Sequence, residues 1–257
     1  MVIERWLRVY GDSLRRIAET EAAWWNSEVE MALVASGMTE GEMLQAQADL
    51  GSQMTPLIDQ ALLAIYHAQQ EHTWSQVFVE HVESALEQVG LYRRLDRPPA
   101  MCFLDLTGYT RLTEERGDEA AADLAARLAT LVRRSSQEHR GTPVKWLGDG
   151  VMFYFREPAD AVLAALEMAE VVGRQGLPPA HVGIHAGPVI FQDGDYFGRT
   201  VNLAARIAEY ARPGEVVVSQ EVVDAADRRP VAFTEIGPVE LKGVPGTLRL
   251  HITRRPA

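Results

Sequence analysis

The stretches MCFLDL at 101–106 and KWLGDGVMF at 145–153 decide how the second half of this chain folds. In each stretch an apolar run stops at a bend with glycine: Gly108 follows the first run, and Gly148 and Gly150 lie within the second stretch. This pattern is typical of a β-strand that ends in a turn. Asp105 lies at the end of the first run and Asp149 in the bend of the second. Because carboxylates at strand ends can overhang one cleft, we expect them to hold a divalent metal there. A plain Asp-Gly hairpin turn is the alternative for Asp149.

Outward from these stretches, short apolar runs alternate with helical segments from Pro99 to the C-terminus. This alternation predicts an α/β domain over 98–257. The segments with helical period are 118–139, 159–172 and 201–210, and the runs with strand character are 101–106, 143–147, 151–155, 181–186, 188–192, 215–219, 231–236 and 248–252.

The segment before Pro98 has a different pattern, with apolar residues at three- and four-residue spacing. It predicts an all-α domain over 1–97 that ends in a linker helix at about 73–92. Gly37 followed by Thr39 and Glu42 indicates a helix end and then a capping box. One stripe of the last helix carries Phe78, Val82, Ala85 or Leu86, and Val89. This stripe either packs within the helical domain or pairs with the same helix of a second copy.

Composition sets the class of protein. The chain has 257 residues, of which 47% are hydrophobic and 24% charged, a normal balance for a globular protein. The sequence contains no apolar run of 18 residues and does not begin like a signal peptide, so we expect a soluble, cytoplasmic protein without a membrane span. Cys102 is the single cysteine, which excludes an intrachain disulfide or a multi-cysteine zinc site.

The charge is negative and unevenly distributed. The net charge is −11; residues 1–100 carry 7 basic and 15 acidic side chains, and the remainder carries 18 and 21. An acidic surface repels a phosphate backbone, so we expect no nucleic acid partner. A mononucleotide can still bind where local cations and metals dominate.

Five ordered motifs carry a family resemblance: FLDLTGYTRL at 103–112, VKWLGDGVMFYF at 144–155, VGIHAGPV at 182–189, GDYFGRTVNLAARI at 194–207 and VELKG at 239–243. From about Pro99 onward the chain resembles the catalytic domain of class III adenylate and guanylate cyclases. The resemblance implies a ferredoxin-like, palm-type α+β fold for this domain. It also implies a regulatory role for the helical domain, with an unidentified regulatory ligand possible there.

The resemblance implies that Asp105 and Asp149 hold two divalent cations, Mg²⁺ or Mn²⁺, with help from the backbone carbonyl of Leu106. In cyclisation, the ribose 3′-hydroxyl attacks the α-phosphorus and pyrophosphate leaves. One metal would acidify that hydroxyl, and the other would neutralise charge on the leaving phosphates. The loop of Thr107, Gly108, Tyr109 and Thr110 follows Asp105 and opens a helix, so its backbone N–H groups can face the phosphates.

Lys145 and Asp195 resemble the adenine-selecting pair of adenylate cyclases, where guanylate cyclases carry Glu and Cys. Adenine offers an acceptor at N1 and a donor at its amino group, which an ammonium and a carboxylate match, whereas guanine reverses both. A guanine would leave buried polar groups facing like partners, a mismatch that can discriminate by about 10⁴-fold. Without the other motifs, each of these two residues would be read as an ordinary surface residue.

Asn202 and Arg206 lie four residues apart, hence on one face of a predicted helix. By resemblance, Asn202 orients the ribose, Arg206 stabilises charge on the α-phosphate, and Lys242 binds the terminal phosphates. In this family, the metal aspartates come from one catalytic domain, and the Lys, Asp, Asn and Arg set comes from a partner. The resemblance therefore implies a head-to-tail homodimer that acts on ATP at two equivalent sites.

Two other functions compete with an adenylate cyclase that makes cyclic AMP. One is a catalytically silent domain that senses a nucleotide through the same pocket, although no expected functional position is missing. The other is a palm-type relative such as a diguanylate cyclase or polymerase. The bend Leu-Gly-Asp-Gly lacks the signature of the diguanylate cyclases, and the acidic charge disfavours a nucleic acid template.

Overall fold

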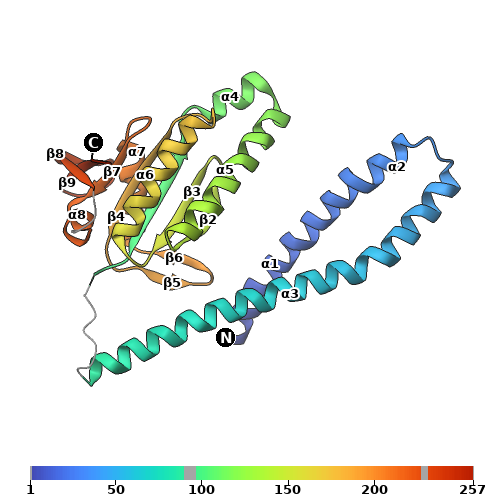
Figure 1. Ribbon diagram of the computed structural model, residues 1–257, viewed down its shortest axis with the longest axis horizontal. Helices are drawn as coiled ribbons and strands as arrows, with labels where there is room; N and C mark the ends of the chain where they lie inside the picture. The colour runs from blue at the N-terminus through green and yellow to red at the C-terminus, as the bar shows by residue number, and fades with distance from the viewer. Residues whose placement is uncertain (1, 90–96, 227–230, 257) are drawn as a thin grey trace. The chain divides into compact units, whose positions relative to one another are not determined.

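The computed structural model describes residues 2–89, 97–226 and 231–256. The chain divides into two compact units, Met1–Leu95 and Asp96–Ala257. Each unit is described below by itself (Figure 1).

The first unit is helical, as predicted. It consists of α1 (Val2–Trp24), a π-helical turn η1 (Trp25–Glu30), α2 (Met31–Ala35) and α3 (Glu40–Gln88). The capping box at the start of α3 is confirmed, because Thr39 donates its backbone N–H to Glu42 Oε2 at 2.9 Å. The hydroxyl of Thr39 accepts the Glu42 N–H in return, at 3.4 Å. Among the helices described, we find none that combines the length and the apolar character needed to cross a membrane.

The prediction of a separate helix at 73–92 is wrong, because α3 runs unbroken for 49 residues and includes Pro56. Positions 90–92 lie outside the described residues. The apolar stripe does not pack within its own unit: Phe78 is 68% exposed and Val89 67%. None of the described side chains between positions 2 and 89 is buried, so these described residues form no buried core within a single chain.

The second unit is built on a seven-stranded sheet of order β2-β3-β1-β4-β7-β9-β8. Its mixed α/β architecture confirms the predicted fold class. The strands are β1 (Ala100–Leu106), β2 (Gly141–Leu147), β3 (Gly150–Phe155), β4 (Ala180–Ala186), β7 (Val216–Ser219), β8 (Ala232–Glu240) and β9 (Thr247–Arg254), and the helices are α4 (Tyr109–Arg116), α5 (Asp118–Glu138), α6 (Pro158–Arg174), α7 (Arg199–Tyr210) and α8 (Gln220–Ala225).

Sequence patterns missed two short elements. The strand β6 (Asp195–Phe197) pairs with β5 (Ile190–Gln192) in a separate two-stranded ribbon. Three residues are too few to show a period of two, so only the pairing defines this strand. The six-residue helix α8 directly follows β7 and is too short to show a helical period.

The two faces of the sheet carry different helices, and this difference places the aspartates. Cys102, Leu104 and Leu106 of β1 pack in the main core with residues of α5 and α6. Met101 packs on the other face in a smaller cluster with Ala204 of α7. Because side chains alternate along a strand, Asp105 falls on the α7 face.

Two glycines permit close approaches near this face. A Cβ at Gly150, the partner of Asp105 across β1 and β3, would lie 3.0 Å from Asp105 Oδ1. A Cβ at Gly183 of β4 would lie 2.0 Å from the backbone nitrogen of Ala208, so only glycine lets α7 lie this close to the sheet. The backbone of α7 is therefore fixed against the sheet beside Asp105.

Candidate active site

Asp105 and Asp149 line one cavity of about 230 Å³ on the α7 face of the sheet. Asp105 is the penultimate residue of β1, and Asp149 lies in the two-residue bend between β2 and β3. Gly148 makes this bend possible with a φ of 72°, which favours glycine. His181 of β4 and Glu209 of α7 line the same cavity. The two carboxylates predicted from strand ends are thus brought together.

The electrostatics of this cavity suit a cation. Burial raises the pKa of Asp105, and the negative charge of Asp149 raises it further. His181 and the backbone N–H of Leu106 act in the opposite direction and favour the ionised carboxylate. Two carboxylates that repel each other in a partly desolvated cavity fit a hard divalent cation, whose charge would relieve that repulsion. The part assigned to the Leu106 carbonyl stays a prediction.

His181 is a site residue that sequence reasoning missed. Its Nε2 lies 3.5 Å from Asp105 Oδ2, and its Nδ1 lies 3.1 Å from the hydroxyl of Thr107. It therefore links the carboxylate of Asp105, the predicted metal ligand, to the predicted phosphate loop. The signal was the pairing of β1 with β4, which sets Asp105 opposite His181, but a single sequence does not show which strands are neighbours.

The loop after Asp105 has the expected form. Gly108 has a φ of 75° and is the residue before α4, so the backbone turns sharply into a helix N-terminus. The hydroxyl of Tyr109 donates to the carbonyl of Ala121 at 3.0 Å, which commits it to holding α4 against α5. Any contribution of Tyr109 to phosphate binding would come from its backbone. The side chain of Thr110 lies outside the described residues.

Lys145 and Asp195 are brought together from β2 and β6. Lys145 Nζ lies 2.5 Å from Asp195 Oδ2, and Asp195 Oδ1 accepts the backbone N–H of Tyr196 at 2.8 Å. The ammonium group is the more exposed partner of the pair. One edge of a ligand could therefore meet a donor and an acceptor side by side.

Asn202, Arg206 and Lys242 are all on the surface. Asn202 and Lys242 are exposed, the first on α7 and the second in the turn between β8 and β9. Arg206, also on α7, donates from one nitrogen, Nη1, to both carboxylate oxygens of Glu209, at 2.7 and 2.6 Å. Glu209 is the second site residue that sequence reasoning missed.

The residues predicted to bind the nucleotide do not line the aspartate cavity of their own chain. Among the residues that the structure describes, the lining of that cavity includes Glu209 but none of the set predicted to bind the base, the ribose and the phosphates. That set comprises Lys145, Asp195, Asn202, Arg206 and Lys242. Two groups of candidate residues thus occupy different places on one catalytic unit.

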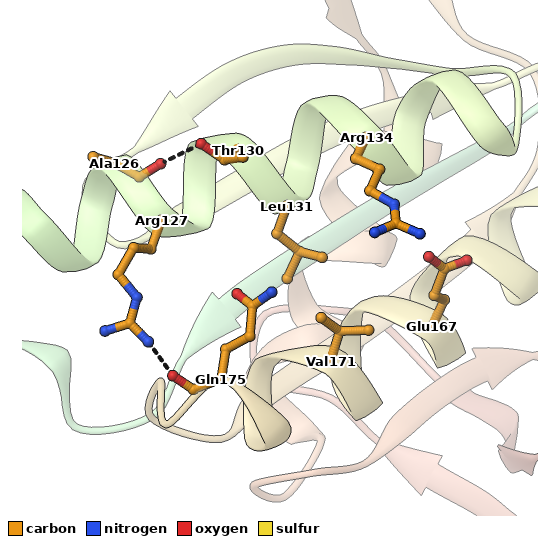
Figure 2. Close-up of a pocket in the computed structure, with 8 residues that line it drawn as sticks. All are labelled: Ala126, Arg127, Thr130, Leu131, Arg134, Glu167, Val171 and Gln175. Carbon is orange, nitrogen blue, oxygen red and sulfur yellow. Dashed lines mark hydrogen bonds between the residues drawn. The ribbon is translucent and has the colours of Figure 1, made fainter.

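A different hollow, of about 370 Å³, lies between α5 and α6, on the side of the sheet away from α7 (Figure 2). Arg127, Arg134 and Glu167 line it, and Arg127 is tied to the carbonyl of Gln175. None of the site residues predicted from the sequence lines this hollow, so we do not assign the catalytic function to it.

The fold and the paired carboxylates together define a domain of the nucleotide cyclase type. Residues 96–254 match the family model described as the adenylate and guanylate cyclase catalytic domain. The chain belongs to this family.

Named relatives agree with this membership. The chain is 32% identical over 234 residues to a pH-sensitive adenylate cyclase of Mycobacterium tuberculosis; the match covers 88% of this chain and 57% of the relative. It is 30% identical to an adenylate cyclase of Streptomyces griseus, over 71% of this chain and 43% of that protein. The chain thus spans about half the length of these relatives.

Solved structures share the fold of the second unit. The adenylyl cyclase CyaB from P. aeruginosa matches with a TM-score of 0.56 at 23% identity, over 63% of this chain and 95% of that one. An adenylate/guanylate cyclase/hydrolase from Silicibacter pomeroyi matches with a TM-score of 0.53 at 27% identity, over 63% and 99%.

Proposed function

We propose that this chain is an adenylate cyclase that converts ATP to 3′,5′-cyclic AMP and pyrophosphate. The observation that carries the choice of ATP is the ion pair of Lys145 with Asp195, which presents a donor beside an acceptor. The edge of adenine requires this order, and guanine requires the reverse. Family membership and two relatives named adenylate cyclases support the same proposal.

In the proposed reaction, the ribose 3′-oxygen forms a bond to the α-phosphorus, the bond from that phosphorus to the pyrophosphate oxygen breaks, and the hydroxyl proton passes to solvent. Bound divalent cations would supply acidification of the hydroxyl and neutralisation of phosphate charge. Asp105 and Asp149 are the residues that would hold them. Arg206 places its guanidinium on the charge that develops at the α-phosphate, Asn202 orients the ribose, and Lys242 binds the outer phosphates.

We also propose that each site is shared by two chains arranged head to tail. The support is that, among the described residues, the lining of the aspartate cavity includes none of the residues proposed to bind the nucleotide. One chain would donate Asp105 and Asp149 and its partner the remaining set. A dimer would then contain two equivalent sites, each incomplete in a single chain.

Purified full-length chain should convert ATP, in the presence of Mg²⁺ or Mn²⁺, to a product that co-elutes with 3′,5′-cyclic AMP. GTP should be a much poorer substrate. Product identification by mass spectrometry separates the alternatives, because a silent sensing module would bind ATP without turnover and a diguanylate cyclase would form a cyclic dinucleotide from GTP. Either of those results would contradict the proposal.

The shared site predicts complementation between two inactive variants. Asp105→Ala and Asn202→Ala should each be inactive alone, whereas a co-purified heterodimer of the two should recover up to about half of the wild-type rate, because one of its two sites contains every residue. Differently tagged subunits allow isolation of the heterodimer. An inactive heterodimer would contradict the shared site, and each variant mixed with itself is the control.

For the helical unit we propose regulation through dimerisation. The apolar stripe of α3, with Phe78, Val82, Leu86 and Val89, is exposed in one chain and would be buried by pairing with the same stripe of a second chain. The 234-residue match to the M. tuberculosis protein is longer than the catalytic unit and therefore extends into this region.

A further inference from the structure

We infer that Glu209 is a positioning residue for Arg206, which it holds so that the guanidinium points its remaining N–H groups at the α-phosphate. This inference rests on the proposed function, because it concerns the transition state of cyclisation at the same site. The two residues lie one turn apart on α7. Nothing in the motifs predicted a role for Glu209.

The contact between the two side chains leaves much of the guanidinium available. Both oxygens of Glu209 accept from Nη1 of Arg206, at 2.7 and 2.6 Å. A guanidinium has five N–H donors in a rigid plane, so a carboxylate that takes one nitrogen fixes the plane without consuming the rest of the donors. The groups on Nη2 and Nε can then reach a phosphate.

The pair has little to contribute to stability. The side chains of Arg206 and Glu209 are 41% and 59% exposed, and exposed ion pairs three or four residues apart on a helix contribute little to folding. The benefit of holding a flexible arginine lies in the orientation of its charge when negative charge develops on the substrate. Loss of Glu209 should therefore lower turnover and leave the fold intact.

The rigid attachment of α7 supports this role. The backbone nitrogen of Ala208, the residue before Glu209, lies where a side chain at Gly183 would be. The segment of α7 that carries the pair is thus seated on β4, and Glu209 has a fixed base from which to hold the longer arginine side chain.

Glu209 also lines the cavity of Asp105 and Asp149, which gives it a second conceivable role, at the metals of its own chain. The contacts favour the arginine, because Glu209 makes two short hydrogen bonds to it. The two roles differ in which chain of the dimer must supply Glu209, so an experiment can separate them.

We expect Glu209→Ala to lower kcat about 10- to 100-fold, as loss of a residue that orients a site ligand does, with the KM for ATP within about 3-fold of wild type. Glu209→Gln, which keeps an oxygen acceptor, should lose less. Glu235→Ala is the matched control, since Glu235 forms a similarly exposed pair with Arg249 away from the site and its loss should leave kcat unchanged. Wild-type kcat in Glu209→Ala would overturn the inference.

A double variant tests whether Glu209 acts through Arg206. Arg206→Ala combined with Glu209→Ala should be no slower than Arg206→Ala alone, because the second change removes a support for a group that is already gone. If the two losses multiply instead, Glu209 acts independently and the inference is wrong. This comparison uses homodimers only and holds whether or not the sites are shared.

Crossed heterodimers then locate Glu209 within the dimer. Glu209→Ala paired with Asp105→Ala should recover activity, because one site keeps both Arg206 and Glu209 from the same chain. Glu209→Ala paired with Arg206→Ala should stay at or below the rate of Glu209→Ala. The reverse pattern would assign Glu209 to the metals and overturn the inference. The heterodimer of Asp105→Ala with Asn202→Ala is the control. If it is inactive, the shared site is wrong, and the double variant alone decides the role of Glu209.

Discussion

Replacing Lys145 by Glu and Asp195 by Cys together should collapse or invert the preference for ATP over GTP. In the structure, the ammonium and carboxylate groups of these residues lie 2.5 Å apart and present a donor and an acceptor side by side. Glu in place of Lys145 would accept from guanine, and Cys in place of Asp195 would no longer oppose the guanine carbonyl with a charge. We expect the ratio of kcat/KM for ATP to that for GTP to fall by about 10⁴-fold.

The single variant Lys145→Glu is the informative control for this prediction. It sets two carboxylates against each other where an ion pair now exists, so it should lose activity with ATP without gaining activity with GTP. Thermal unfolding should show an intact fold in the double variant, because Lys145 is 42% exposed. A double variant that turns over and keeps the wild-type ratio would show that another part of the site chooses the base.

Asp105→Asn should lower the rate of cyclisation by about 10³-fold and, in the absence of metal, raise the thermal stability of the protein. The activity should fall because Asp105 is a proposed metal ligand, and a metal is expected to contribute several kcal/mol to transition-state stabilisation. The stability rises because burial and the charge of Asp149 raise the pKa of Asp105, which means that its ionised form is disfavoured in the folded chain.

The sign of this effect sets its pH dependence. A carboxyl group whose pKa is higher in the folded state destabilises the fold once it ionises, so the penalty is present at neutral pH and disappears below the ordinary value of 3.8. The advantage of Asp105→Asn over wild type in metal-free melting should therefore shrink as pH falls. Added Mg²⁺ or Mn²⁺ should raise the melting temperature of the wild type more than that of the variant. A variant less stable than wild type in chelator at pH 7 would contradict this account.

Sequence patterns predicted most of the catalytic unit because its strands are apolar runs bounded by turns. They also predicted that Asp105 would meet Asp149, because both carboxylates follow apolar strands, whereas the pairing of Lys145 with Asp195 came from the motifs of a known family. His181 and Glu209 were not predicted, since their roles come from which strands and helices are neighbours. The continuity of α3 was missed because a proline such as Pro56 resembles a helix boundary.

The glycine at position 183 has a consequence for how the proposed dimer would be switched. It locks α7, which we propose serves the opposite subunit, onto β4, the strand that pairs with the one carrying Asp105. The aspartates and the α7 residues of one chain therefore move together as a single rigid body. A rotation of one subunit against the other would open or close both reaction centres in concert, so we expect control of this protein to act on the pair and not on one centre at a time.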